Sequence, residues 1–376
     1  MSASIVSAAS ACPRGVTRRA APARPTRHAP PTVRGPRVVA RASIPDPTPT
    51  YVEVFDGQSG QMEKVLSQGV EAVTAGGLDW SFRVGVPADG AAAAVPNKVI
   101  FVHGAGLVAF TYSKLMKEMQ EAGFQCYAPD MPGHGGTSKP APGSDFRYDA
   151  ASYSAALEAF ITETGIAAAA PVDLVVSGFL TSQAALLLAA ARPALFRRVV
   201  VLNAPLGNGH KLPDALGVYN RPFGMGKGAK ADVYKLAYFG NEFALAADRI
   251  AEYEAPYGGA GGEAARAALE ATCIACDLKS LMEQVATAFR ARPGPKVRVV
   301  WGSSDKYLGD APMYKWTDDV RASFDCMRKV GHMPQEDFPQ ETAKFIKAFL
   351  ESELKVSALG SVRLSKVGKD DDYDRD

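Results

Sequence analysis

Long hydrophobic runs are missing from this 376-residue sequence. The longest apolar stretch surrounds Ala184–Ala191, far below the ~20 residues that a transmembrane helix needs. Cysteine is also scarce, with five residues, and a chain of this length can bury a large core without disulfide bonds. These absences exclude a transmembrane segment and a disulfide-rich scaffold, and free thiols are expected.

Acidic residues and lysine are absent from the first 45 residues, which hold eight arginines among Ser, Ala and Pro. This composition is typical of an organelle transit peptide, and it lacks the apolar core of a secretory signal. The sequence Val38–Ala42 resembles plastid processing sites. We therefore expect residues 1–45 to be a transit peptide and the protein to reside in the chloroplast, with a basic tail that stays attached as the alternative.

Excess positive charge is lacking in the rest of the chain. Without the eight arginines, 34 Lys and Arg stand against 40 Asp and Glu, so the net charge is −6 instead of +2. No basic stripe remains that would indicate nucleic-acid binding. Cys273 and Cys276 form a C-x-x-C pair with no nearby His and no second pair, so no metal and no cofactor is expected. The pair is explained either by two small core residues or by a redox switch.

Short apolar strands and helices alternate from Lys98 onward. Strands are expected at 98–102, 124–128, 173–176, 198–203, 296–301 and 324–330. Continuous apolar strands alternating with helices predict an α/β fold, a mostly parallel sheet covered by helices on both faces. Before this region, Tyr51–Phe55 and Trp80–Val86 are expected to be strands and Gln61–Val73 a polar helix.

The alternation stops between 206 and 293, where helix-forming residues and Gly-rich breaks indicate a helical cap. The expected organisation is a core in two parts, 46–205 and 294–356, with the cap 206–293 inserted between them. Residues 357–376 are expected to be a disordered charged tail. Caps exclude water and shape a pocket, so specificity is expected to reside there.

Four loop motifs follow the predicted strands in order: HGAG at 103–106, DMPGHGGTS at 130–138, GSSD at 302–305 and VGHMPQED at 330–337. With the strand, turn and helix at Val172–Pro193, they resemble the α/β-hydrolase superfamily over Tyr51–Leu354, and most of all its epoxide hydrolase and haloalkane dehalogenase branch. The resemblance implies an α/β-hydrolase fold with a helical cap. It also implies His332 as general base, Asp305 as the acid that orients it, and the backbone N–H groups of Ala105 and Leu180 as the oxyanion hole.

The nucleophile is the missing part of this pattern. The turn requires small residues two positions before and two after the nucleophile. Phe179 has Ser177 and Thr181 at those positions, whereas centring the turn on Ser177 or Ser182 places a bulky residue there. We therefore predict Phe179 at the nucleophile position, with Ser177 and Ser182 as alternative nucleophiles. Thr181 in place of glycine suggests a relaxed turn.

Two functions stay open. In the first, His332 and Asp305 act as a dyad that performs general-base rather than covalent catalysis on a small hydrophobic substrate. In the second, the protein is a catalytically inactive pseudoenzyme that binds a hydrophobic plastid metabolite or a protein partner. The sequence indicates neither the identity of the ligand nor the oligomeric state.

Overall fold

The structure is a computed structural model that describes residues 48–56, 60–88, 97–220, 232, 235–236, 245–291 and 294–352. These residues all belong to one compact unit. The predicted transit peptide at 1–45 and the predicted tail at 357–376 lie outside the described residues.

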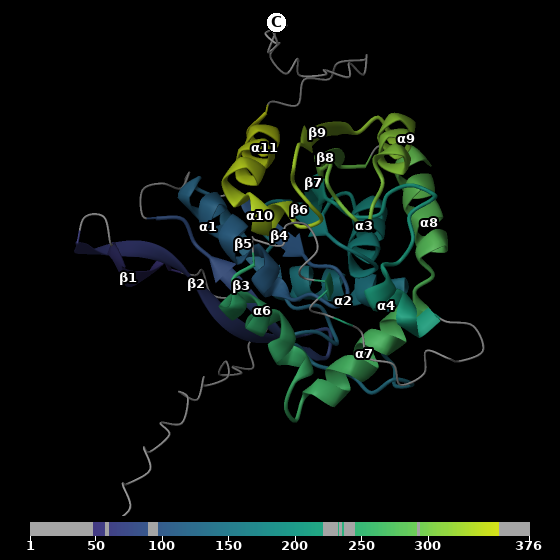
Figure 1. The fold of residues 1–376 in the computed structure, drawn as a ribbon, viewed down its shortest axis with the longest axis horizontal. Helices are drawn as coiled ribbons and strands as arrows, with labels where there is room; N and C mark the ends of the chain where they lie inside the picture. Colours follow the sequence, from purple (N-terminus) through teal and green to yellow (C-terminus); the bar gives the residue numbers. More distant parts are fainter. Residues whose placement is uncertain are drawn as a thin grey trace, which may run out of the picture. The chain divides into compact units, whose positions relative to one another are not determined.

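A single sheet organises the described residues, with strand order β1-β2-β3-β5-β4-β6-β7-β8-β9 (Figure 1). Six neighbouring strands run parallel to one another: β5, β4, β6, β7, β8 and β9. The strands β1, β2 and β3 pair antiparallel with their neighbours. The strands span β1 Thr50–Asp56, β2 Gln61–Ala75, β3 Leu78–Gly85, β4 Lys98–Val102, β5 Gln125–Pro129, β6 Val172–Ser177, β7 Phe196–Leu202, β8 Lys296–Gly302 and β9 Ser323–Met327. The predicted parallel sheet is therefore confirmed.

The segment predicted as a polar helix is a strand instead. Gln61–Ala75 pairs with β1 through its first half and with β3 through its second half. Its polar residues are tolerated because the first half of the strand is largely exposed. The prediction was wrong because pairing with two neighbouring strands overrides the helical composition of the segment.

Helices cover both faces of the sheet, as predicted. On one face α1 (Ser113–Glu121) packs against α11 (Pro339–Glu351), and on the other α3 (Thr181–Ala191) packs between α2 (Ala150–Glu163) and α8 (Leu278–Ala291). Alternate residues of β6 contribute to two separate cores: Leu174 and Val176 to the α3 side and Val175 to the α1 side. This division follows from the two-residue period of a strand.

Helices are the main regular elements of the described chain between β7 and β8. It contains α4 (Asp214–Gly217), η2 (Val218–Asn220), α6 (Ala247–Glu254), η4 (Ala255–Tyr257), α7 (Gly262–Ala275) and α8. The last of these packs on α3 and on α9 (Asp310–Val320), which places α8 among the helices of the core. The remaining elements are η1 (Ala109–Tyr112), after β4, and α10 (Pro334–Asp337), after β9. No described helix has the length and apolar character that crossing a bilayer requires.

Candidate active site

The sharp turn between β6 and α3 carries its strain on Leu180. This residue has φ 66° and ψ −69°, and Gly178 before it has φ 77°. In the hydrolase elbow the nucleophile is the residue held in the strained conformation. The structure therefore corrects the predicted register by one position, from Phe179 to Leu180, and the turn is not relaxed as Thr181 had suggested. Leu180 is fully buried and has no group that can attack a substrate.

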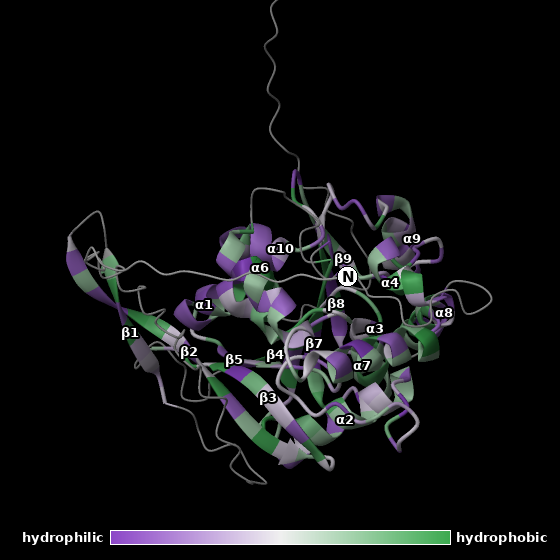
Figure 2. Cartoon of the chain, turned by 60° about the horizontal axis from the view of Figure 1, so that its bottom comes forward, coloured by the Kyte–Doolittle hydropathy of each residue, from purple (hydrophilic) through white to green (hydrophobic). Residues whose placement is uncertain are grey.

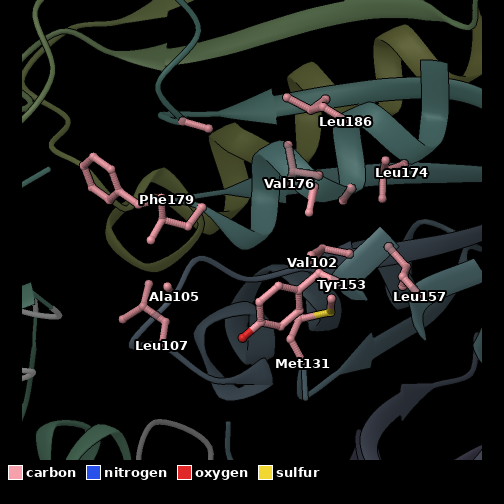
Figure 3. Packing of buried hydrophobic residues seen from close by; sticks show 14 of the residues in the cluster. Val102, Ala105, Leu107, Met131, Tyr153, Leu157, Leu174, Val176, Phe179 and Leu186 are labelled. Atoms are coloured by element: carbon pink, nitrogen blue, oxygen red, sulfur yellow. The ribbon is translucent and has the colours of Figure 1, made fainter. Parts of the chain in front are cut away.

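Two glycines allow the elbow to touch the loop after β4. A Cβ atom on Gly104 would lie 2.5 Å from the backbone nitrogen of Phe179, and one on Gly178 would lie 3.0 Å from the Cα atom of Gly104. Any side chain at Gly104 would therefore separate the two loops. Figure 3 shows the result, with Phe179 projecting beyond the strand that carries Leu174 and Val176 and lying above Ala105.

The backbone donors of the expected oxyanion hole already have acceptors. The carbonyl oxygen of Phe179 accepts hydrogen bonds from the N–H of Ala105 at 2.8 Å and from the N–H of Thr181 at 2.9 Å. The N–H of Leu180 donates to Oε1 of Gln183 at 2.5 Å, which caps the start of α3. Ala105 and Leu180 were the predicted donors. With Leu180 at the strained position, the residue that follows it is Thr181, so Thr181 replaces Leu180 as the second donor of the pair. A carbonyl of the chain itself thus lies where the developing charge of a substrate would lie.

His332 and Asp305 come together as the resemblance implied. Nδ1 of His332 lies 2.7 Å from Oδ2 of Asp305, and both side chains are almost completely buried. Their loops follow β9 and β8, two neighbouring parallel strands. The carboxyl ends of such strands meet at one edge of the sheet, which explains the pairing of residues so distant in sequence.

Asp305 is held by three other donors. Nδ2 of Asn203 donates to Oδ2 at 2.9 Å, and the backbone N–H groups of Tyr307 and Leu308 donate to Oδ1 at 2.7 and 3.2 Å. Asn203 in turn bonds both the N–H and the carbonyl of Gly302, so it fastens the end of β7 to the end of β8. Burial acts to raise the pKa of Asp305, but His332 and these donors outweigh burial and lower it.

The imidazole of His332 is enclosed by aromatic rings. Phe179 stacks on it with ring centroids 5.1 Å apart, and the edge of Tyr307 meets it at 5.1 Å. Because Nδ1 faces a carboxylate, the proton of the neutral ring resides there and Nε2 is an acceptor. Nε2 is buried and has no hydrogen-bond partner in the described part of the chain.

The two alternative nucleophiles make their contacts elsewhere. The hydroxyl of Ser177 accepts hydrogen bonds from Tyr112 at 2.9 Å and from Gln335 at 3.4 Å. The hydroxyl of Ser182 donates to the carbonyl of Gly178, one helical turn back. Neither serine is hydrogen-bonded to His332, so the base has no hydroxyl to activate among these residues.

Leucines from the inserted helical segment cover the loop beside the dyad. A Cβ on Gly106 would lie 2.6 Å from Leu236 and within 4 Å of Leu216 and Leu269. A cavity of about 180 Å³ is present further away, between β3, η1 and α6, and its lining includes Arg83 and Asp130 but neither His332 nor Asp305. The dyad lies outside this cavity and brings two titratable side chains into direct hydrogen-bond contact.

A buried carboxylate fastens helix α6 to the segment that follows His332. Glu336 on α10 accepts a two-pronged hydrogen bond from Arg249 of α6, and Lys114 lies 2.8 Å from its Oε1. Tyr253, one turn along α6, donates to it at 3.1 Å. A glutamate that is 1% exposed requires such partners. The sequence motif contained Glu336, but nothing in it indicated Arg249 as the partner.

The remaining histidines and cysteines of the motifs are structural. His103 accepts from the N–H of Met131 at 2.9 Å, and burial lowers its pKa to about 4; burial also lowers the pKa of His134 to about 3. Cys273 and Cys276 are buried free thiols, and burial raises both pKa values, that of Cys276 to about 12. Thiolates are disfavoured there, which argues against a redox switch. Within the described ranges no three His, Cys, Asp or Glu side chains cluster as metal ligands.

Comparison with known proteins identifies the fold. The sequence profile of the alpha/beta hydrolase family matches residues 99–345, whereas no curated protein matches the chain. Among solved structures, haloalkane dehalogenase DbeA from Bradyrhizobium elkani USDA94 is similar with a TM-score of 0.59 and 19% identity, over 76% of this chain and 98% of the other.

Two further structures are comparable. A serine hydrolase involved in carbazole degradation has a TM-score of 0.57 and 20% identity over 76% of this chain and 99% of its own. An alpha/beta hydrolase fold protein from Burkholderia ambifaria has a TM-score of 0.56 and 16% identity over 74% and 95%. At these identities the likeness establishes the fold alone.

Proposed function

Because this chain belongs to the alpha/beta hydrolase family, we propose that it is a binding protein built on the hydrolase fold and that it forms no covalent intermediate with a substrate. The observation that carries this proposal is the Phe179 carbonyl, which accepts from both Ala105 and Thr181. Oxyanion donors accelerate acyl transfer only when they are free to bind the developing charge. Here the pair is already satisfied by the chain.

The residue at the strained position supports the same conclusion. Leu180 is apolar, and Ser177 and Ser182 are engaged with Tyr112 and Gly178 instead of His332. A nucleophile must lie within hydrogen-bond reach of its base. None of the three residues around the elbow meets this requirement.

The surroundings of His332 favour a small, mostly apolar ligand. Phe179 and Tyr307 present ring faces and edges, and Leu216 and Leu269 lie nearby over Gly106. Within these apolar surroundings, Nε2 of His332 is a buried acceptor without a partner. A ligand with one hydroxyl or N–H group would satisfy it, because an unpaired buried acceptor costs about 1–3 kcal/mol.

Ligand recovery tests this proposal. We expect organic extraction of the purified chain, followed by mass spectrometry, to release a small apolar compound with a hydroxyl or N–H group at a near-stoichiometric amount. His332→Phe keeps a flat ring but removes the acceptor, and should lose the compound. Asp319→Ala, on an exposed ion pair far from the elbow in sequence, is the matched control and should keep it. A protein that is recovered empty, or binding that His332→Phe leaves unchanged, contradicts the proposal.

One observation favours a second candidate, a general-base enzyme without a covalent step. His332 has a free Nε2 and a carboxylate on Nδ1, the arrangement that lets an imidazole accept a proton and keep its positive charge stabilised. The base would act on water or on a proton of the bound small molecule. Turnover that disappears in His332→Phe and persists in Leu180→Ala would support this candidate over the binding protein.

We also propose that the chain is imported into plastids by residues 1–45. The support is compositional, eight arginines without an acidic residue. Fusing these residues to a fluorescent protein should direct it into plastids, whereas a version with the arginines changed to glutamine should stay outside. Equal import of both versions contradicts the proposal.

A further inference from the structure

The first strand forms an open edge of the sheet. Among the described strands, β1 is the terminal one in the sheet order and has β2 as its only neighbour. It pairs with Gln61–Ser67, while β3 begins to pair with β2 only at Gln68. β1 and the first half of β2 therefore form a two-stranded ribbon that extends from the larger sheet (Figure 1).

This ribbon exposes an unusual amount of apolar surface. Of the eight large hydrophobic side chains that are exposed within the described residues, five lie here: Tyr51, Val52, Val54, Phe55 and Met62. Phe55 is 63% exposed. Figure 2 shows hydrophobic and hydrophilic residues interspersed along β1 and β2. A two-stranded ribbon is marginally stable in water by itself, so a covering partner would stabilise it.

The other edge of the sheet lacks these features. β9 spans five residues and carries the ion pair between Asp325 and Arg298 of β8. Arg321 and Lys329 flank it with positive φ angles, so the chain turns away at both ends. Short length and charge are ordinary protections against edge pairing. β1 has seven residues, no lysine, no proline and an uninterrupted register with β2.

We propose that the β1 edges of two copies of this chain pair antiparallel about Glu53, which joins the two sheets into one. The sequence of β1 is self-complementary about this residue. A two-fold axis at Glu53 places Val52 opposite Val54 of the second copy and Tyr51 opposite Phe55 of the second copy. Valine pairs and aromatic pairs are favourable cross-strand neighbours.

Charge favours the same register. Glu53 meets its own equivalent at the axis, which alone would be repulsive. Lys64 of β2 lies directly across from Glu53 in each copy, so the row across four strands reads Lys, Glu, Glu, Lys. Moving the axis by half a residue would place Val52 or Val54 opposite Glu53 and lose this match. The apolar pairs and this charged row thus both match a second copy of the strand in this register.

A single cysteine tests the register. In a background with Cys12→Ser and Cys326→Ser, Glu53→Cys places two thiols opposite each other, with Cβ atoms ~5 Å apart, close to the spacing of a disulfide. Oxidised glutathione should convert the full chain to a cross-linked dimer. Val52→Cys is the matched control, because its nearest equivalent lies ~7–8 Å away on the diagonal, and it should cross-link at least tenfold more slowly. Equal cross-linking of both variants, or none, overturns the proposal.

Sedimentation tests the interface without a covalent bond. We expect the full chain to sediment as a dimer, and Val52→Lys with Val54→Lys, which brings four lysines together, to weaken the dimer at least about tenfold. Val70→Lys is the control, because Val70 is as exposed as Val52 at 48% but lies on β2 beyond the β1 pairing. A monomer at all concentrations, which is also what pairing with a segment of the same chain would give, overturns the proposal. So does a dimer that Val70→Lys disrupts equally.

Discussion

Asp305→Ala is the substitution whose effect follows most directly from the structure. The carboxylate accepts hydrogen bonds from His332, Asn203, Tyr307 and Leu308, and it is completely buried. Alanine leaves all four donors without their acceptor and opens a small cavity between the ends of β7, β8 and β9. If the dyad has a structural role, the substitution lowers the stability of the fold. If the dyad were a strained catalytic pair, its removal would raise the stability of the fold.

The loss of stability can be estimated from the cost of breaking a buried pair. Removing one partner of a buried pair costs about 3–5 kcal/mol, out of a total stability of roughly 5–15 kcal/mol for a domain. A shift of roughly 2–4 °C per kcal/mol then lowers the melting temperature by about 6–20 °C. Asp305→Asn should lose less, because its remaining oxygen still accepts from the two backbone N–H groups.

Urea unfolding of the two variants measures this prediction, with Asp319→Ala as the control. Asp319 forms an exposed pair with Arg290, and its loss should change stability by at most about 1 kcal/mol. The lowered pKa of Asp305 also sets the pH dependence. Its contribution is present above the pKa of an unfolded Asp and is lost as the pH falls through the lower folded value. An Asp305→Ala variant as stable as the control would refute the structural role of the dyad.

Three further predictions concern single sites. Leu180→Gly should cost about 1–3 kcal/mol less than Leu186→Gly in urea unfolding, because both leucines are buried but only Leu180 has a strained backbone that glycine relieves; equal costs would argue against strain at the elbow. Glu336→Gln should destabilise the fold by about 3 kcal/mol and speed proteolysis within α6, while Glu351→Gln, on an exposed pair, should do neither. Burial raises the pKa of Asp337 to about 6, so its ionised form destabilises the fold at neutral pH. Asp337→Asn should therefore raise the melting temperature at pH 7.5 and change it little near pH 4. An equal shift at both pH values would contradict this cause.

The sequence predicted the fold well where apolar strands are continuous. The strands β4, β5, β6 and β7 are buried on both faces, so hydrophobic content alone marks them. The exposed half of β2 has no such signal, because a ribbon open to water accepts polar residues in either a helix or a strand. Hydrophobic periodicity therefore failed to predict the exposed half of this strand, because burial places no demand on its residues.

The candidate site was predictable in its residues but not in its backbone. His332 and Asp305 come together because motif order determines which strand ends carry them. The register of the elbow depended on the size of neighbouring side chains, and this criterion chose Phe179, whereas the backbone places the strain on Leu180. The N–H of Ala105 donates to the carbonyl of Phe179 because of the way that peptide group is oriented, and residue types do not indicate this orientation. Asn203 is the last residue of the strand predicted at 198–203, and a polar residue at such an end is the signal that could have pointed to it. Tyr307 lies further on, in the loop after the strand predicted at 296–301, and no comparable signal marks it.

An acyl-transfer experiment measures directly whether the chain forms a covalent intermediate. The full chain is mixed with excess p-nitrophenyl acetate and butyrate, release of p-nitrophenol is followed from the first milliseconds, and the intact mass is measured at intervals. We expect no burst, no acyl adduct, and a steady rate that His332→Phe leaves unchanged. A burst equal to the amount of protein, with an acyl group on Ser177 or Ser182 that His332→Phe abolishes, would contradict it.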